Sequence, residues 1–319
     1  MWKTILRRVL LMIPQIIILS ILVFFLAKLM PGDPFSGKIT PKTDPATIAR
    51  LKQQLGLNDP PLVQYWHWVV NVFHGNLGMS YTYERPVIGL IGERAANTFW
   101  LGLLTAILTY ALAIPLGVIA GRHEGQWPDR VIAFYNFIVN AIPPFAIYLI
   151  LLILFSFILK IFPSSGTVSA NAHGFFGVVM SRLYHMILPA IAMTLSGTIS
   201  IVQYLRSGII DNTQEDYVKT ARSKGVPENV IFRKHILRNS FLPIASSIGL
   251  TILNLLSGAL VAEQIFSYPG MGQLFMQSVM SRDYSVMIAL TLLFGILTLI
   301  GNLLSDIIMS IVDPRIRIQ

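Results

Sequence analysis

The sequence predicts an all-α polytopic membrane protein with six transmembrane helices. Of its 319 residues, 54% are hydrophobic and only 12% are charged, whereas soluble domains carry roughly 25% charged residues. Apolar runs long enough to cross a bilayer recur along the chain, and the basic residues behind its net charge of +9 gather in the loops beside them. Such a charge would suggest nucleic-acid binding in a soluble protein. The positive-inside rule explains it here, so we expect a lipid bilayer and no nucleic acid as partner.

The first span is expected at residues 9–30, after the basic residues Lys3, Arg7 and Arg8. A charged start is also typical of a signal peptide. The apolar run, however, exceeds the roughly 7–15 residues of such a peptide, and no small-residue cleavage site follows. We therefore expect an uncleaved first helix with a cytoplasmic N-terminus.

Five further apolar segments complete the predicted topology and place both chain ends in the cytoplasm. These segments are residues 97–120, 131–161, 184–204, 241–261 and 286–312. The chain then divides into the N-terminal end with the first helix (1–30), a sizeable extracytoplasmic loop (31–96), a core of five helices (97–312) and a cytoplasmic tail (313–319). The short loops and tails assigned to the cytoplasm hold most of the basic residues, as the positive-inside rule requires.

Helices are also expected inside the extracytoplasmic loop, at residues 46–55 and 61–73. The second contains Tyr65, Trp66 and Trp68. Aromatic residues of this kind fit either a membrane interface or a small extracellular core, and the sequence favours neither.

Two features of the predicted spans point to a pathway or to helix packing. Pro143 and Pro144 are expected to bend the third span near its middle, which either exposes backbone carbonyls or only improves packing. The central polar residues are amides rather than charges, and they either line a path for a polar substrate or bond between helices. As candidate path-lining residues we take Asn136, Asn140, Asn254 and Asn302.

The polar, basic loop at residues 207–240 is predicted to be an ordered pair of short helices. Asn212 with Glu215 fits a capping box, Gly225 fits a left-handed residue after the first helix, and Pro227 fits the start of the second. A plain tether would be rich in Gly and Ser. The loop is therefore predicted to be a surface that another protein holds, the alternative being an ordinary basic cytoplasmic loop.

The sequence offers no energy source of its own. No phosphate-binding loop of the required spacing is present, and the ionisable residues of the spans fall near their ends, which disfavours an ion-coupled carrier. No arrangement of catalytic residues appears, and without cysteine there are no disulfides or thiolate sites. The protein is therefore expected not to be an enzyme and to hold no metal or cofactor.

Stretches in three regions of the chain resemble the permeases of bacterial ABC importers for oligopeptides and dipeptides. Residues 216–225 (DYVKTARSKG) are similar to the cytoplasmic coupling loop of that family, with Lys219 in place of its usual Glu and a later proline at Pro243. Residues 31–34 (PGDP) and 75–80 (GNLGMS) resemble its first external loop, with Asn76 where Asp is usual. Residues 263–274 (EQIFSYPGMGQL) and 282–285 (RDYS) resemble its last external turn.

The resemblance implies the transmembrane domain of a type I ABC importer in the bacterial cytoplasmic membrane. It implies that the loop couples to an ATPase through Asp216, Tyr217, Lys219, Thr220, Ala221, Lys224 and Gly225. It also implies a second, homologous permease, two ATPase subunits that bind ATP and Mg²⁺, and an extracytoplasmic binding protein that delivers peptide. Permeases for nickel or glutathione share these loops and remain alternatives, and an ion-coupled carrier is the rival from another class.

The last external turn, together with the loop at residues 31–96, is the candidate gate and docking face for the binding protein. Its residues are Glu263, Pro269, Gly270 and Gly272. The alternative is a passive turn, because Pro-Gly forms a turn for backbone reasons alone.

Overall fold

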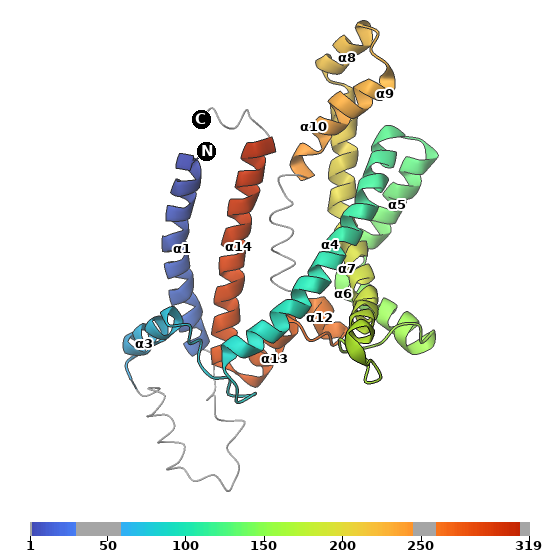
Figure 1. The fold of residues 1–319 in the computed structure, drawn as a ribbon. Coiled ribbons are helices and arrows are strands. Elements are labelled where there is room, and N and C mark those ends of the chain that lie inside the picture. The colour runs from blue at the N-terminus through green and yellow to red at the C-terminus, as the bar shows by residue number, and fades with distance from the viewer. Residues whose placement is uncertain (1, 30–58, 245–259, 313–319) are drawn as a thin grey trace.

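The computed structural model describes residues 2–29, 59–244 and 260–312, and every named element in these ranges is a helix (Figure 1). The elements are α1 (Trp2–Leu29), α3 (Pro61–Phe73), α4 (Val87–Arg122), α5 (Trp127–Ala141), α6 (Pro144–Leu152), the π-helix η1 (Ile153–Ile158), α7 (Gly174–Thr213), α8 (Asp216–Ser223), α9 (Glu228–Ile231), the π-helix η2 (Phe232–Leu237), α10 (Arg238–Ser240), α12 (Leu260–Ile265), α13 (Met271–Ser281) and α14 (Tyr284–Val312). This agrees with the predicted all-α class.

Four of these helices are long and apolar enough to cross a membrane: α1, α4, α7 and α14. Helix α5 and the segment Pro144–Ile158 form a broken pair, bent by 94°, that would supply a fifth span. The predicted span at 241–261 and the predicted helix at 46–55 fall largely or wholly outside the described residues. Within the described residues, the apolar helices match the other five predicted spans.

The bend between α5 and α6 confirms the effect expected from the two prolines. Ile142 is extended, and Pro143 and Pro144 occupy the N-cap and first position of α6. A proline disfavours helical backbone in the residue before it. The consequence is a sharp turn in the third predicted span rather than a gentle tilt.

Two spans begin earlier than the sequence pattern predicts. Helix α4 begins at Val87 and not at 97, directly after Pro86, and α7 begins at Gly174 and not at 184. The added turns contain polar residues such as Glu93 and Arg182, so they lie outside the apolar stretch that marks a span. The segment before α4 therefore ends at Pro86, ten residues before the end of the loop predicted at 31–96.

Helices α1 and α14 form an antiparallel pair. Near one end, Arg8 Nη1 lies 2.6 Å from Asp306 Oδ2, and near the other end Phe24 packs in one cluster with Met287 and Ile288. Between them Gly295 faces the side chain of Leu19 so closely that a Cβ would collide with it. The pair is therefore held at both ends and in the middle.

Helices α4 and α7 run parallel and pack along their length. A Cβ on Gly117 would lie 2.9 Å from the Cβ of Leu205, and one on Gly121 would lie 2.8 Å from that of Ile209. Small residues let two helices approach closely in a membrane. These contacts place the end of α7, and the loop that follows it, directly against the end of α4.

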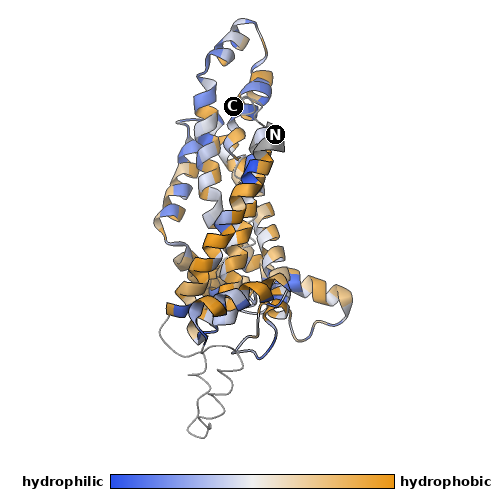
Figure 2. Cartoon of the chain, turned by 90° about the vertical axis from the view of Figure 1, so that its left-hand side faces the viewer, coloured by the Kyte–Doolittle hydropathy of each residue, from blue (hydrophilic) through white to orange (hydrophobic). Residues whose placement is uncertain are grey.

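The molecule has two opposite ends (Figure 1). The first residues of α1 and the last residues of α14 lie on the side of α8 and α9, whereas α3 and α13 lie on the opposite side. Hydrophobic residues cover the helices between these ends, and hydrophilic residues gather toward α8 and α9 (Figure 2). The molecule thus has an apolar middle and two distinct polar ends.

Candidate coupling loop and external turn

The predicted turn at Gly225 is present and is a complete Schellman motif. Gly225 has φ +73°, its N–H donates to Arg222 O (2.9 Å), and the N–H of Val226 donates to Ala221 O (3.2 Å). Both bonds satisfy carbonyls that the end of α8 would otherwise leave unpaired. The break between α8 and α9 therefore has a fixed geometry.

The predicted capping box is wrong. Helix α7 continues through Asn212 to Thr213, and the N-cap of α8 is Glu215, which makes no side-chain cap bond. Asn212 instead donates to Gly208 O (2.7 Å) and accepts from the Tyr217 hydroxyl (2.5 Å). Packing of the long α7 helix overrides the local capping signal.

Helix α8 has a buried face and an exposed face. Val218 and Ala221 are buried in one hydrophobic cluster with Ile209, Ile231 and Ile236. The other predicted coupling residues are exposed: Asp216, Tyr217, Lys219, Thr220, Lys224 and Gly225. Ala221 thus packs inward, against the loop's own core.

Short local bonds stiffen the exposed face of α8. Lys219 Nζ lies 2.9 Å from Asp216 Oδ1, which lowers the pKa of that carboxyl. Thr220 Oγ1 donates to Asp216 O (2.8 Å). Tyr217 joins α8 to its neighbours, since its hydroxyl also accepts from Asn239 Nδ2 (3.1 Å).

The α8–α9 unit is attached to the end of α4. Arg222 pairs with Glu228 (2.7 Å) across the turn and lowers the pKa of the Glu228 carboxyl. Arg122, the last residue of α4, donates to Asn229 Oδ1 (3.1 Å) and lies over the Phe232 ring, 5.0 Å from its centroid. These contacts join α9 and η2 directly to the last residue of α4.

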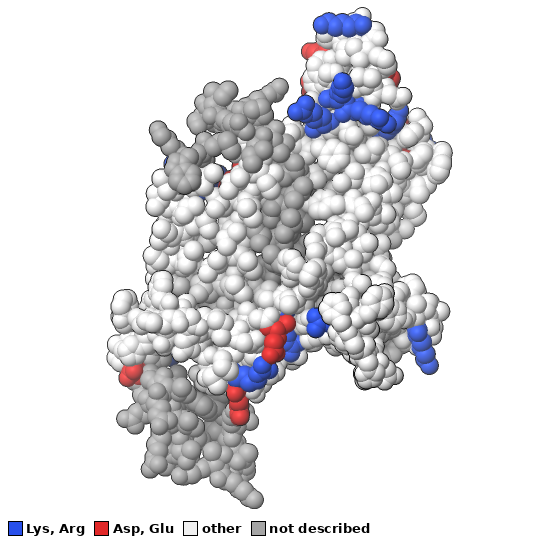
Figure 3. All heavy atoms as spheres, viewed as in Figure 1, with Lys and Arg blue, Asp and Glu red and all other residues white. Residues whose placement is uncertain are grey.

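Basic side chains surround this unit. Figure 3 shows Lys and Arg at the tip of α8 and in a row lower down, over the segment that includes α9 and α10. Among the exposed basic residues of the segment are Lys219, Arg222, Lys224, Arg233, Lys234 and Arg238. The face is positive around the α8–α9 turn.

An ion pair between a buried carboxylate and a half-buried guanidinium, below the loop, was missed by the sequence analysis. Arg206 on α7 makes two bonds to Asp129 on α5, Nε to Oδ1 (2.6 Å) and Nη2 to Oδ2 (2.8 Å). Asp129 also accepts from the Gly125 N–H (2.9 Å). The pair fixes the turn between α4 and α5 to the end of α7.

At the opposite end, the external turn closes around a buried carboxylate. Glu263 on α12 is fully buried. Its Oε1 accepts from Thr98 Oγ1 on α4 (2.8 Å), and its Oε2 accepts from the Gln273 N–H at the start of α13 (3.0 Å). Thr98 Oγ1 in turn accepts from the Met271 N–H (2.8 Å). A polar group buried in this way is stable only when it is hydrogen-bonded.

Two glycines of the turn make room for that carboxylate. A Cβ on Gly270 would lie 2.3 Å from Glu263 Oε1, and one on Gly272 would lie 2.8 Å from Leu260 Cα. Asn97 Nδ2 donates to Pro269 O (2.8 Å). All four predicted turn residues thus belong to one structure that is bound to α4 at positions 97 and 98.

Three of the four candidate path residues lie in the part of the chain that the structure describes. Asn136 is buried, and its Oδ1 accepts no hydrogen bond from the described residues. Asn140 and Asn302 are exposed, and Asn254 lies outside the described residues. Of the three described residues, only Asn136 is buried, and its side-chain oxygen accepts no hydrogen bond from the described part of the chain.

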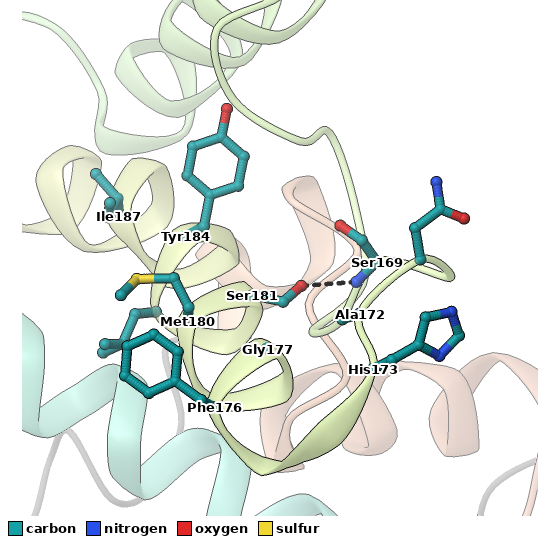
Figure 4. A pocket seen from close by; sticks show the side chains of 11 residues that line it. Ser169, Ala172, His173, Phe176, Gly177, Met180, Ser181, Tyr184 and Ile187 are labelled. Carbon is teal, nitrogen blue, oxygen red and sulfur yellow. Dashed lines mark hydrogen bonds between the residues drawn. The ribbon is translucent and has the colours of Figure 1, made fainter.

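A shallow hollow of about 700 Å³ lies beside the first turns of α7 (Figure 4). Its lining is mostly apolar and includes Phe176, Met180 and Tyr184. The N–H of Ser169 donates to Ser181 Oγ (2.8 Å) and ties the preceding loop to the helix. The hollow lies at the end of α7 that is remote from α8.

Two protein-family models match the sequence of this chain. The model described as "Binding-protein-dependent transport system inner membrane component" matches residues 113–318, which hold the α8–α9 loop and the external turn. The model of the N-terminal part of such membrane components matches residues 1–102. The chain belongs to this family of ABC importer permeases. A permease of this family spans the inner membrane several times and works with ATPase subunits and a binding protein.

The sequence similarity to known permeases extends over almost the whole chain. It is 39% identical to the oligopeptide transport system permease protein AppB of Bacillus subtilis (strain 168), over 98% of both chains. It is 35% identical to the glutathione transport system permease protein GsiC of Salmonella choleraesuis (strain SC-B67), over 99% of both chains. An inward-facing structure of the MetNI methionine ABC transporter superposes with TM-score 0.55 at 16% identity, covering 71% of this chain and 97% of that one. This last likeness confirms the type I importer fold.

Proposed function

We propose that this permease carries oligopeptides or dipeptides across the cytoplasmic membrane as part of an ATP-driven importer. The support is the pair of full-length relatives, one named for oligopeptides and one for glutathione. Glutathione and nickel are the alternative substrates within the family, and an ion-coupled carrier is the alternative outside it.

The α8–α9 unit is the element through which ATPase movement reaches the permease. The observation that carries this proposal is the attachment of the unit to α4 through Arg122, together with its closed Schellman turn. Closure of the ATPases would shift a rigid unit and, with it, α4 and α7. Such a rigid-body change moves the population between inward-facing and outward-facing states.

Two kinds of residue share this task. Asp216, Tyr217, Lys219, Thr220, Lys224 and Gly225 are exposed and supply the surface that an ATPase contacts. Ala221 is buried and supplies the packing that holds this surface in place.

The chemistry of ATP takes place in the partner subunits. The sequence has no phosphate-binding loop of the required spacing, so ATP and Mg²⁺ are bound by two ATPases, and this chain is a transport subunit rather than an enzyme. The full assembly contains a second, homologous permease and an extracytoplasmic peptide-binding protein. The family description supports the binding protein in general terms.

The α8–α9 end faces the cytoplasm, because that is where ATPases are. Helix α1 begins and α14 ends at the same end (Figure 1), which supports cytoplasmic N- and C-termini. The turn formed by Glu263, Pro269, Gly270 and Gly272 then faces outward as gate and docking face for the binding protein. Asn136, Asn140, Asn254 and Asn302 are the proposed contacts along the path.

Transport by the reconstituted complex tests this function. Proteoliposomes that contain both permeases, both ATPases and the binding protein should accumulate labelled peptide only with ATP. The permease alone should accumulate none under a proton or sodium gradient. Peptide accumulation by the permease alone would contradict the proposal, and uptake of nickel but not peptide by the full complex would correct the substrate.

A further inference from the structure

Helix α3 has one apolar face that is packed against α1. The Phe24 ring of α1 lies 5.5 Å from the Tyr65 ring and 5.8 Å from the Trp68 ring, centroid to centroid. The Tyr65 hydroxyl lies 2.8 Å from Ser20 Oγ. Two of the three aromatic residues noted in the sequence therefore fill a small core.

A second apolar face of α3 has no cover among the described residues. At about 100° per residue, Leu62, Trp66 and Phe73 fall within an arc of about 40°, on the side away from Trp68. Their exposed fractions are 73%, 64% and 87%. Large apolar side chains grouped on one exposed face mark an interaction surface.

A narrow polar stripe separates the two apolar faces. His67 and Asn71 are exposed, and Gln64 donates to Asp59 O (2.7 Å). By helical periodicity these three fall within an arc of about 60°. Helix α3 is thus apolar on most of its circumference, with one side suited to water.

The contacts with α1 fix the depth of α3. The apolar stretch of α1 runs from Ile5 to Leu29. At 1.5 Å per residue, Ser20 lies about 13 Å and Phe24 about 8 Å before its end. Leu22 and Leu26, on the same turns of α1, are 53% and 60% exposed. The contacts therefore place α3 beside turns of α1 whose own apolar side chains are exposed, and a bilayer that covers these turns would reach α3 as well.

We propose that α3 is an interfacial helix that lies in the bilayer leaflet at the end opposite α8. Leu62, Trp66 and Phe73 insert at the boundary between lipid headgroups and acyl chains, and His67 and Asn71 face water. Helices of this kind bind through buried apolar area, and tryptophan favours this boundary. Through Phe24 and its cluster with Met287 and Ile288, the helix holds the ends of α1 and α14 at a fixed depth.

Spin-label accessibility tests this placement. The chain contains no cysteine, so a nitroxide is attached to W66C, F73C or the matched control H67C, one at a time. The complete transporter, built with cysteine-free partner subunits, is reconstituted in lipid bilayers. Collision with O₂, which concentrates in lipid, is compared with collision with a water-soluble nickel chelate.

The labels at 66 and 73 should collide several-fold more with O₂ than with the chelate, and the label at 67 should show the reverse. Higher collision with the chelate at 66 and 73 would place this face in water and overturn the proposal. Low collision with both reagents would show that protein covers the face, either residues 30–58 or another subunit, and would overturn it equally.

Discussion

Arg122 lies over the ring of Phe232 at 5.0 Å and donates to Asn229, so the last residue of α4 is bound to the segment that follows α8. The same helix holds the external turn through Asn97 and Thr98. From Thr98 to Arg122 the helix rises by about 36 Å, which is close to the thickness of the hydrocarbon core. One continuous helix therefore joins the coupling loop to the candidate gate.

Replacing Arg122 should uncouple the two ends. The variant R122A loses a contact over an aromatic ring worth about 0.5–2 kcal/mol and one hydrogen bond, so we expect fewer peptides transported per ATP hydrolysed. The measurement is peptide uptake and ATPase rate in the same proteoliposomes. R122K retains the charge and should be intermediate. An unchanged ratio in R122A would show that α4 does not receive movement here.

Removing the buried carboxylate should destabilise the external end. E263A leaves Thr98 and the N–H of Gln273 without an acceptor, at a cost of about 1–3 kcal/mol for each group. Thermal unfolding of the purified complex should show a lower melting temperature, with partial recovery in E263Q. The control is Q264A, the exposed neighbour. Equal melting temperatures of the E263A and Q264A complexes would refute the structural role of Glu263.

The same substitution at two glycines of α4 should have opposite effects. G121A forces a Cβ to within 2.8 Å of Ile209 and should cost about 1–3 kcal/mol of stability. At Gly92 nothing lies within 4 Å, so G92A should stabilise the helix slightly, since alanine is the better helix former. Melting temperatures of the two variants provide the comparison. A stable G121A would mean that α4 and α7 are not in close contact.

Breaking the ion pair between Asp129 and Arg206 should be costly, because Asp129 is buried. R206M leaves the buried Asp129 carboxylate without its partner, and D129N removes the charge that Arg206 binds, each at about 1–3 kcal/mol; the double variant should recover part of that loss. The exposed pair Asp216 and Lys219 is the control, and its removal should leave the melting temperature unchanged. If the loss of stability in the double variant equals the sum of the losses in the two single variants, Asp129 and Arg206 do not interact directly.

Local backbone signals in the sequence were the most reliable guides. Gly225 was predicted to adopt a left-handed conformation and does so, because few other residues tolerate φ +73°. Pro143 and Pro144 were predicted to bend a span and they break it. In each case the residue type itself restricts the backbone, because glycine permits a positive φ and proline disfavours helix in the residue before it.

Features that depend on distant partners could not be predicted. Asp129 looks like an ordinary acidic residue in the first turn of a helix, and nothing near it in the sequence indicates Arg206. Glu263 was predicted as part of a gate, but its burial depends on Thr98, which comes from another helix. The capping signal at Asn212 failed because α7 packs beyond it. Ala221 could not be assigned to the buried face before the core around Ile209 and Ile236 was known.

The central claim is that movement generated by separate ATPase subunits enters this permease through the exposed face of α8. The most direct measurement places a photo-crosslinking residue at Thr220, with a second at Gln264 as control, in a complex that transports peptide. We expect the probe at 220 to capture an ATPase subunit and the probe at 264 to capture none. A transporting complex in which the probe at 220 captures no ATPase would contradict the account.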